Sequence, residues 1–344
     1  MAYTTINKST DYFNTVLYTG TGSSNSVTGV GFRPDWLWIK NRSTTSSHIV
    51  QDVVRGATKQ VYPDLANAEV TGSDGVSSFD SDGFTVGTGA SFNGNGNNIV
   101  AWNWLAGGSQ GSANTDGSTN TTYTSVNTTA GFSISKWTPS GSAETVGHGL
   151  GVAPKMIITK NLGASQGWFT YHHSIGATKY LLLNDSATEA TGSTAWNDTA
   201  PTSSVFSVGS QFAGSDYMAY CFAEKIGFSK FGSYVGNGND HGSIIYTGFK
   251  PAWFMVKCST YGGQNWIMFD NKRDPYNEMN KGLRANTTGA EDTSTSYNDV
   301  DFLSNGIKIR EDNDNVNRQG ETYIYMAFAE QPLVGTNNIP ATAR

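Results

Sequence analysis

The sequence is poor in charged residues and in cysteine. Asp, Glu, Lys and Arg together make up 15% of its 344 residues, against about 25% in an average soluble domain. The two cysteines, Cys221 and Cys258, are too few for the disulfide framework of a small secreted domain. Both lie in apolar runs that are typical of strands, so we predict buried free thiols, with a disulfide between them as the alternative.

The sequence also lacks a basic cluster and a long apolar run. The net charge is −6 and the cations are scattered, so we expect no nucleic-acid partner, because such binding depends on gathered positive charge. No apolar run approaches the roughly 18 residues that identify a membrane-spanning helix. The first residues, MAYTTINKST, have no basic start followed by an apolar core, so no secretory signal is expected.

Aromatic residues and small polar residues fill the place of the missing charges. Trp, Tyr and Phe reach 12% of the chain and occur in short runs separated by Gly, Asn, Asp and Ser. A disordered chain would lack these aromatic side chains, because they favour burial. Short apolar runs between turn-forming residues are typical of many short strands joined by tight turns. The composition therefore predicts an all-β fold.

One pattern recurs three times along the chain. In each copy a glycine turn is followed, 12 or 13 residues later, by a proline that opens an apolar strand, and a lysine lies six residues beyond that proline. The three stretches are GFRPDWLWIK with Pro34 and Lys40, GVAPKMIITK with Pro154 and Lys160, and GFKPAWFMVK with Pro251 and Lys257. Proline lacks an N–H group and suits the start of a strand. The repetition predicts a repeated domain.

Further landmarks follow each strand in the same order. A glutamate recurs as Glu69, Glu189 and Glu291, and the first two copies share the sequence GATK before it. The turn sequences SDGF (Ser81–Phe84) and SNGI (Ser304–Ile307) predict hairpins, because Asp-Gly and Asn-Gly favour positive φ angles. Each copy then closes on an apolar aromatic strand, which we expect in the core.

These offsets predict three tandem β-sandwich units, each of about 100 residues with about eight to ten strands. The predicted units are residues 1–108, 109–231 and 232–344, the last with a C-terminal tail. Residues 106–131, rich in Gly, Ser, Thr and Asn, are the best linker candidate. This segment is also a candidate for the first edge strand of the second unit.

Metal sites are not favoured by the available motifs. The neighbours His172 and His173 would point to opposite faces of a strand, so we expect structural histidines rather than ligands of one metal. The stretches Asp80–Gly83 and Asp312–Asn315 fail the EF-hand pattern, because Phe84 and Val316 occupy the fifth position. We predict hairpin turns at both, and a calcium site assembled from separate loops stays open.

Catalytic residues are not predicted either. Glu69, Glu189 and Glu291 are the acids common to the three copies, one in each, whereas glycoside hydrolysis needs a pair of carboxylates across a cleft. We expect these glutamates to cap turns or to pair with Lys40, Lys160 and Lys257. The sequence contains no G-x-S-x-G on a strand-to-helix turn and no phosphate loop ending in GK[ST]. We therefore predict no catalytic residue, no metal ligand and no cofactor.

Four aromatic residues near Gly- or Ser-rich loops are candidates for sugar binding: Trp168, Trp196, Tyr261 and Trp266. Exposed aromatic faces beside polar side chains hold sugars in many proteins. The alternative, which we favour, is that they pack in the core or between units.

The ordered motifs resemble repeat proteins of marine tailed bacteriophages. The stretches that carry the resemblance are GFRPDWLWIKNRS, VRGATK, SFDSDGF and VAWNWLAGG in the first copy, VGHGLGVAPKMIITK in the second, and FLSNGIKIR and YIYMAFAEQP in the third. The resemblance covers nearly the whole chain. It implies a virion structural protein with lectin-like or jelly-roll sandwiches, and it supplies no catalytic residue.

We accordingly predict a non-enzymatic virion protein, assembled in the host cytoplasm and used as a tail fibre or host-attachment component on the particle surface. Weak contacts by each unit would be multiplied by copy number. The expected partners are other virion proteins, further copies of the chain in a homo-oligomer (a trimer for a fibre) and a host surface glycan. The alternatives are a capsid decoration protein and a glycan depolymerase, which would need two acids converging in one groove.

Overall fold

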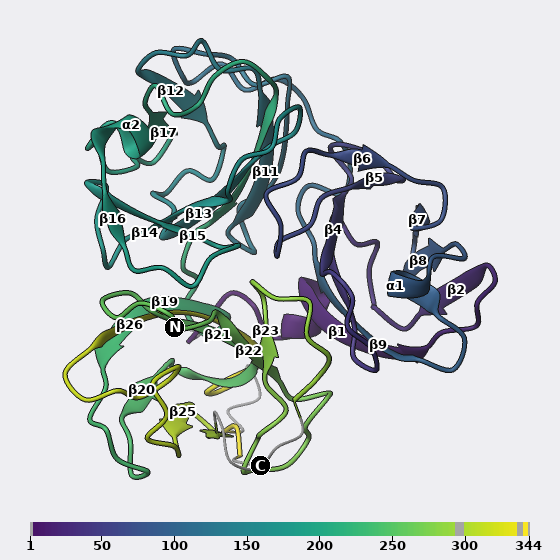
Figure 1. Cartoon of the computed structure of the whole chain (residues 1–344), viewed down its shortest axis with the longest axis vertical. Helices are drawn as coiled ribbons and strands as arrows, with labels where there is room; N and C mark the ends of the chain where they lie inside the picture. The colour runs from purple at the N-terminus through teal and green to yellow at the C-terminus, as the bar shows by residue number, and fades with distance from the viewer. Residues whose placement is uncertain (1–2, 293–298, 336–339, 343–344) are drawn as a thin grey trace.

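The computed structural model describes residues 3–292, 299–335 and 340–342. It consists of three β-rich lobes arranged around a common centre (Figure 1). Strands account for 40% of the residues and helices for 3%, which confirms the predicted all-β class. Within the described ranges, no helix has both the length and the apolar character needed to cross a membrane.

Lobe 1 comprises the elements up to β9 and residues up to 108. Its larger sheet is antiparallel, in the order β1 (Phe13–Thr19), β9 (Asn98–Trp104), β3 (Trp36–Asn41) and β4 (Ile49–Asp52). A smaller sheet has the order β2 (Asn25–Thr28), β8 (Gly83–Val86) and β7 (Val76–Asp80). The remaining elements are η1 (Ser9–Asp11), α1 (Ala90–Asn93) and the paired β5 (Lys59–Gln60) and β6 (Val70–Thr71).

Lobe 2 comprises residues 109–228. Its larger sheet has the order β10 (Tyr123–Asn127), β11 (Phe132–Trp137), β18 (Tyr217–Phe222), β13 (Met156–Asn161), β14 (Phe169–His172), β15 (Lys179–Leu182) and β16 (Ala190–Thr191). A second sheet pairs β12 (Glu144–Gly147) with β17 (Val205–Val208), and α2 spans Ser193–Trp196. The predicted edge strand within residues 106–131 is confirmed as β10.

Lobe 3 begins with β19, whose first residue is Ser229, upstream of the predicted start of the third unit at residue 232. Its larger sheet has the order β19 (Ser229–Val235), β26 (Thr322–Pro332), β21 (Phe249–Cys258), β22 (Ile267–Asp270) and β23 (Leu283–Arg284). Its smaller sheet has the order β20 (Ile244–Tyr246), β25 (Gly306–Ile309) and β24 (Val300–Phe302).

The closing aromatic strand lies inside each larger sheet, next to the strand that begins near the proline. Its other neighbour is the first strand of the lobe in lobes 1 and 3 (β1 and β19), and the second strand, β11, in lobe 2. β9, β18 and β26 occupy this place, and their side chains are almost all buried, as predicted. Pro34 and Pro154 lie just before β3 and β13. Pro251 instead lies inside β21, at a shift in register against β26, where a missing N–H group is tolerated.

The predicted turns at Ser81–Phe84 and Ser304–Ile307 do join paired strands. Gly83 has the expected positive φ, at 153°, whereas Gly306 does not, and both glycines are also required by a close approach of the facing strand. A Cβ on Gly83 would lie 1.9 Å from the carbonyl oxygen of Val27, and one on Gly306 would lie 2.2 Å from that of Ile245. The facing strands β2 and β20 approach too closely for any side chain. The stretch Asp312–Asn315 is not a hairpin turn, because it connects β25 to β26, which belong to different sheets.

Each lobe has its own apolar cluster, and a further cluster is shared by all three. In the shared cluster the rings of different lobes touch. The ring centroids are 5.0 Å apart for Trp36 and Tyr220, 5.6 Å for Trp104 and Trp253, and 6.2 Å for Phe222 and Phe328. Burial of large aromatic side chains at this centre makes the lobes depend on one another for stability.

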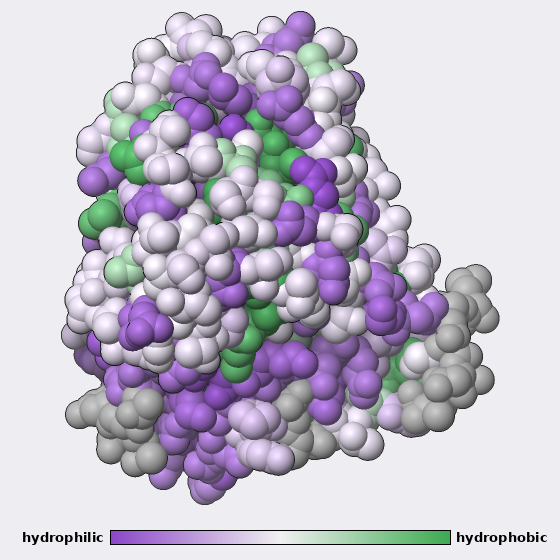
Figure 2. Space-filling view, turned by 90° about the vertical axis from the view of Figure 1, so that its right-hand side faces the viewer, coloured by the Kyte–Doolittle hydropathy of each residue, from purple (hydrophilic) through white to green (hydrophobic). Residues whose placement is uncertain are grey.

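The outer surface is mostly polar on the face that lobe 1 presents. Figure 2 shows hydrophilic and intermediate residues there, with hydrophobic ones in small separate groups.

Both cysteines, Cys221 and Cys258, are buried and free, which confirms the prediction of free thiols.

Candidate functional site

The three recurring lysines are buried, and each reaches from its own lobe into a neighbouring one. The Nζ atoms donate hydrogen bonds to backbone carbonyls: Lys40 to Thr288 of lobe 3 at 2.9 Å, Lys160 to Ala66 of lobe 1 at 2.8 Å, and Lys257 to Ser186 of lobe 2 at 3.3 Å. Lobe 1 thus bonds to lobe 3, lobe 3 to lobe 2, and lobe 2 to lobe 1. The lysine bonds form a closed cycle.

Backbone hydrogen bonds follow the same cycle. The carbonyls that accept from the lysines also accept backbone N–H groups from the lysine's lobe, namely Ser46 at 2.9 Å, Gln166 at 2.8 Å and Gly263 at 3.0 Å. We call the contact between two lobes a seam. In return, the backbone N–H groups of the recurring glutamates donate to backbone carbonyls across each seam: Glu291 to Arg42 at 3.0 Å, Glu69 to Leu162 at 2.9 Å and Glu189 to Ser259 at 2.8 Å. Each pair of lobes is therefore joined by at least three equivalent bonds.

Burial lowers the pKa of Lys40, Lys160 and Lys257 to about 8 in each case. Desolvation disfavours the charged ammonium, and within the described residues backbone carbonyl oxygens, rather than carboxylates, accept its hydrogen bonds. The predicted pairing of these lysines with the recurring glutamates is wrong, because the glutamate carboxylates point to other cations.

The recurring glutamates each bind a cation, but the cation differs between lobes. Glu69 binds Arg55 at 3.2 Å and lies 3.7 Å from Lys59, which is the lysine of the first GATK sequence. Glu189 binds Lys179 of the second GATK sequence. Glu291 binds Arg273 at 2.8 Å within lobe 3 and Arg42 of lobe 1 at 2.6 Å.

Lobe 1 holds a buried ionic network at its seam with lobe 2. The Arg55 Nε atom lies 2.5 Å from Asp52 Oδ2, and both side chains are almost fully buried. The Tyr220 hydroxyl of lobe 2 donates to the same Asp52 oxygen at 2.8 Å. Burial alone would lower the pKa of Arg55, but the carboxylates around it, Asp52 above all, raise it above its ordinary value.

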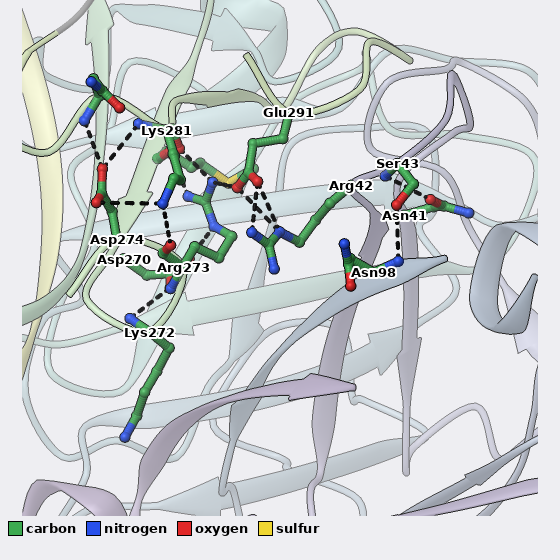
Figure 3. Close-up of polar contacts among 12 residues, drawn as sticks. Asn41, Arg42, Ser43, Asn98, Asp270, Lys272, Arg273, Asp274, Lys281 and Glu291 are labelled. Carbon is green, nitrogen blue, oxygen red and sulfur yellow. Dashed lines mark hydrogen bonds and ion pairs between the residues drawn. The ribbon is translucent and has the colours of Figure 1, made fainter. Parts of the chain in front are cut away.

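Lobe 3 repeats this arrangement at its seam with lobe 1, and Figure 3 shows its charged residues Asp270, Arg273, Glu291 and Arg42. Arg273 Nε lies 2.5 Å from Asp270 Oδ2, which also accepts a 2.9 Å hydrogen bond from Trp102 Nε1 of lobe 1. Arg42 forms a fork with Glu291, with Nε to Oε1 at 3.1 Å and Nη2 to Oε2 at 2.6 Å. Such bidentate pairs are strong and directional.

Lobe 2 carries a neutral version of the same seam. His172 stands where lobes 1 and 3 have Asp52 and Asp270, since all three lie opposite the second residue after the proline. Its Nδ1 accepts the Ser174 N–H group at 3.2 Å, so Nε2 donates to the Tyr325 carbonyl of lobe 3 at 3.1 Å. Burial lowers the pKa of His172 to about 3, so the ring is neutral at physiological pH.

The prediction that the two histidines point to opposite faces of a strand is wrong, because β14 ends at His172 and the centroids of the His172 and His173 rings lie 5.1 Å apart. His173 Nε2 lies 3.2 Å from the Phe231 carbonyl oxygen, so both rings contact the backbone of lobe 3. Across the part of the chain that is described, no group of three or more His, Cys, Asp or Glu side chains is placed to hold a metal ion.

The tryptophans considered for sugar binding are buried. Trp168 Nε1 donates to the Leu65 carbonyl of lobe 1 at 3.0 Å, and Trp266 Nε1 donates to the Leu182 carbonyl of lobe 2 at 3.0 Å. Trp196 lies in the apolar cluster of lobe 2. Packing in the core or between units is confirmed for these three. Tyr261 is half-buried, and the Arg318 guanidinium covers its ring at 3.8 Å.

The two acidic stretches are used in loop contacts. Asp82 Oδ1 accepts the Gly31 N–H group at 2.6 Å, and its Oδ2 accepts that of Gly29 at 3.1 Å. Asp314 forms an ion pair with Arg318 at 2.6 Å. The recurring lysines and glutamates therefore serve mainly to join lobes, and the two acidic stretches fix loops. The spacing of the recurring residues in the sequence did not reveal these partners.

A family model described as a domain of unknown function (DUF7483) matches residues 8–332. The match runs as one domain through all three lobes, which agrees with their shared apolar centre. Neither the curated proteins nor the solved structures gave a match to the chain.

Proposed function

The chain belongs to the DUF7483 family of domains of unknown function, and we propose that it is a non-enzymatic structural protein of a bacteriophage particle. In this proposal it is a tail fibre or host-attachment component, assembled in the host cytoplasm and displayed on the particle surface. The observation that carries the proposal is the closed cycle of bonds from Lys40, Lys160 and Lys257, which ties three lobes into one rigid body.

A structural role uses the recurring residues in the way they are found. A catalytic acid or base must meet a substrate, whereas the lysines lie in the seams between lobes and the recurring glutamates bind neighbouring cations. The resemblance to repeat proteins of marine tailed phages supports a role in the virion, and it leaves the place in the particle open between tail fibre, tail-tip component and head decoration.

The proposal includes three copies of one β-sandwich unit of the jelly-roll or lectin-like kind, at residues 1–108, 109–231 and 232–344. Equivalent strand orders around β9, β18 and β26 support it.

The seams also limit how several chains can assemble, because the inner faces of the lobes are already in contact within one chain. A homo-oligomer, including the trimer expected for a fibre, would therefore form through outer faces.

The test is to locate the protein on intact particles by cryo-electron microscopy, after its presence in purified particles has been checked by mass spectrometry. We expect three-lobed density projecting from the tail, followed by binding to host glycans on an array. Absence of the protein from purified particles would overturn the virion role.

A capsid decoration protein is the second candidate, and the cyclic arrangement of the lobes favours it specifically. A body with three similar lobes around one axis fits a threefold position of a shell. Density spread over the capsid lattice would establish this role in place of attachment.

A glycan depolymerase has less support. The recesses lined by Glu330, Glu224 and Asp292 each contain a single carboxylate, whereas hydrolysis needs two.

A further inference from the structure

The small sheet of lobe 3 ends in a strand with a free edge. β20 pairs with β25 on one side, and its bonds there involve Ser243, Ile245 and Thr247. The N–H and C=O groups of Ile244 and Tyr246 therefore point away from β25, because antiparallel strands bond through alternate residues. No backbone partner for these two residues is found within the described ranges.

This edge is apolar and exposed. Ile244 is 66% exposed, Tyr246 is 58% exposed, and Val235 on the adjoining edge strand β19 is 56% exposed. Residues 242–248, GSIIYTG, contain no charge and no proline. Natural proteins protect free edges with charged residues, proline or a covering segment, because such edges pair with other chains. Within the described residues, β20 contains no charged residue and no proline. The Tyr3 side chain touches one end of the strand, where its hydroxyl donates to the Gly248 carbonyl at 2.6 Å.

The other two lobes do protect the corresponding edge. In lobe 1, the residues that match Ile244 and Tyr246 on β2 are Ser26 and Thr28, both polar. In lobe 2, a segment of the chain itself covers β12, with Thr119 N–H donating to the Thr145 carbonyl at 3.1 Å. The bare apolar edge is thus a property of lobe 3 and not of the fold.

The β20 edge is complementary to itself. If two copies meet antiparallel about a twofold axis at Ile245, then Ile244 lies opposite Tyr246 of the second copy. These residues would exchange both backbone hydrogen bonds, and the isoleucine would contact the tyrosine ring, a favourable cross-strand pair. Ser243 and Thr247 would face each other next, so no like charges meet.

We propose that the chain associates with a second copy of itself through β20, which joins the two small sheets of lobe 3 into one continuous sheet. The contact is isologous, as in most soluble dimers. This inference rests on the edge alone and is independent of the proposed place on a virion.

Sedimentation of the full chain over a range of concentrations tests the proposal. We expect a monomer–dimer equilibrium for the unmodified chain. The variant Ile244→Ser/Tyr246→Thr, which carries the residue types of lobe 1, should weaken the dimer by about tenfold or more, equivalent to about 1.4 kcal/mol. The control Val152→Thr/Ile226→Thr removes exposed apolar residues elsewhere and should leave the equilibrium unchanged. A chain that stays monomeric throughout, or a dimer unaffected by the edge variant, would overturn the proposal.

A cross-link tests the register. In a hydrogen-bonded antiparallel pair the two Cα atoms are about 5.5 Å apart, which lies within the span of a disulfide. The variant Ile244→Cys/Tyr246→Cys should therefore form a covalent dimer on mild oxidation, while the native thiols stay buried. Val235→Cys is the control and should give little dimer. Equal yields from the two variants would contradict the proposed pairing.

Discussion

Lobes 1 and 3 differ from lobe 2 in how they hold their neighbours. Asp52 and Asp270 are each buried beside an arginine, and each accepts a hydrogen bond from an aromatic side chain of the next lobe. In lobe 2, His172 takes the place of the aspartate and Ile175 takes the place of the arginine. The strand that faces His172 carries Met326, which has no donor, where the other seams have Tyr220 and Trp102.

The carboxylate, its arginine and its aromatic donor are thus present together or absent together. This agrees with the energetics of buried charge, which is tolerated when every partner is in place and costly when one is missing. A seam can be built with a complete ionic set or with none. The comparison predicts that partial sets are the least stable.

Breaking one ionic set should have the largest effect. Arg273→Met leaves Asp270 buried without its cation and Glu291 with Arg42 alone, and we expect a loss of about 3–5 kcal/mol in the free energy of unfolding. Chemical denaturation measures it. Lys272→Met is the matched control, because this neighbouring side chain extends away from the network (Figure 3) and should change stability by less than about 0.5 kcal/mol. A loss below 1 kcal/mol for Arg273→Met would show that the network is not stabilising.

Replacing a complete set should cost less than breaking it. The variant Asp52→His/Arg55→Ile/Tyr220→Met installs the residues of lobe 2 in the seam between lobes 1 and 2. The new histidine can donate to the Ala219 carbonyl, which corresponds to that of Tyr325. We expect the triple variant to be more stable than Arg55→Ile alone by about 1–2 kcal/mol, because no unpaired carboxylate remains.

Thermal and chemical unfolding of both variants, measured in parallel, decide the point. A triple variant less stable than Arg55→Ile would mean that the two kinds of seam are not interchangeable.

The sequence was sufficient for much of the fold. The strands after Pro34 and Pro154, the closing strands and the all-β class follow from local patterns of apolar residues, turns and proline, which act over a few residues. The burial of both cysteines and of Trp196 followed for the same reason.

The seams could not be predicted from sequence, because they depend on contacts far apart in the chain. Trp168 stands near a polar loop, yet its ring is buried because the acceptor of its N–H group lies on lobe 1. Lys160 and Glu69 recur at fixed spacing, but the spacing does not reveal that their partners are a carbonyl and an arginine. The repeat in the sequence identified the recurring residues, and the arrangement of the three lobes showed which groups they bind.

Acid should destabilise the seam between lobes 2 and 3 by protonating His172, and this effect can be measured separately from other titrations. The pKa of His172 is about 3 in the folded chain and about 6.5 when unfolded. Its contribution is therefore complete above pH 6.5 and is lost as the pH falls, by about 1.4 kcal/mol per pH unit.

The measurement is the stability difference between the unmodified chain and His172→Gln, taken at pH 7.5 and at pH 5.5. Other titrating groups cancel in this difference, which should change by about 1 kcal/mol in favour of the variant at the lower pH. His241→Gln, at an exposed position, is the control. A difference that does not vary with pH would mean that His172 is accessible to protons in the folded state.

The smallest effect should come from the ion pair that lobe 2 does retain. Lys179 is 38% exposed where it binds Glu189, whereas Arg55 is 1% exposed where it binds Glu69. Exposed pairs contribute about 0.2–1 kcal/mol and are screened by salt. Lys179→Met should therefore cost less than 1 kcal/mol, and the cost should shrink further in 1 M NaCl. A loss as large as that of Arg55→Ile would remove the distinction between the seams, since lobe 2 would then rely on charge as much as lobes 1 and 3.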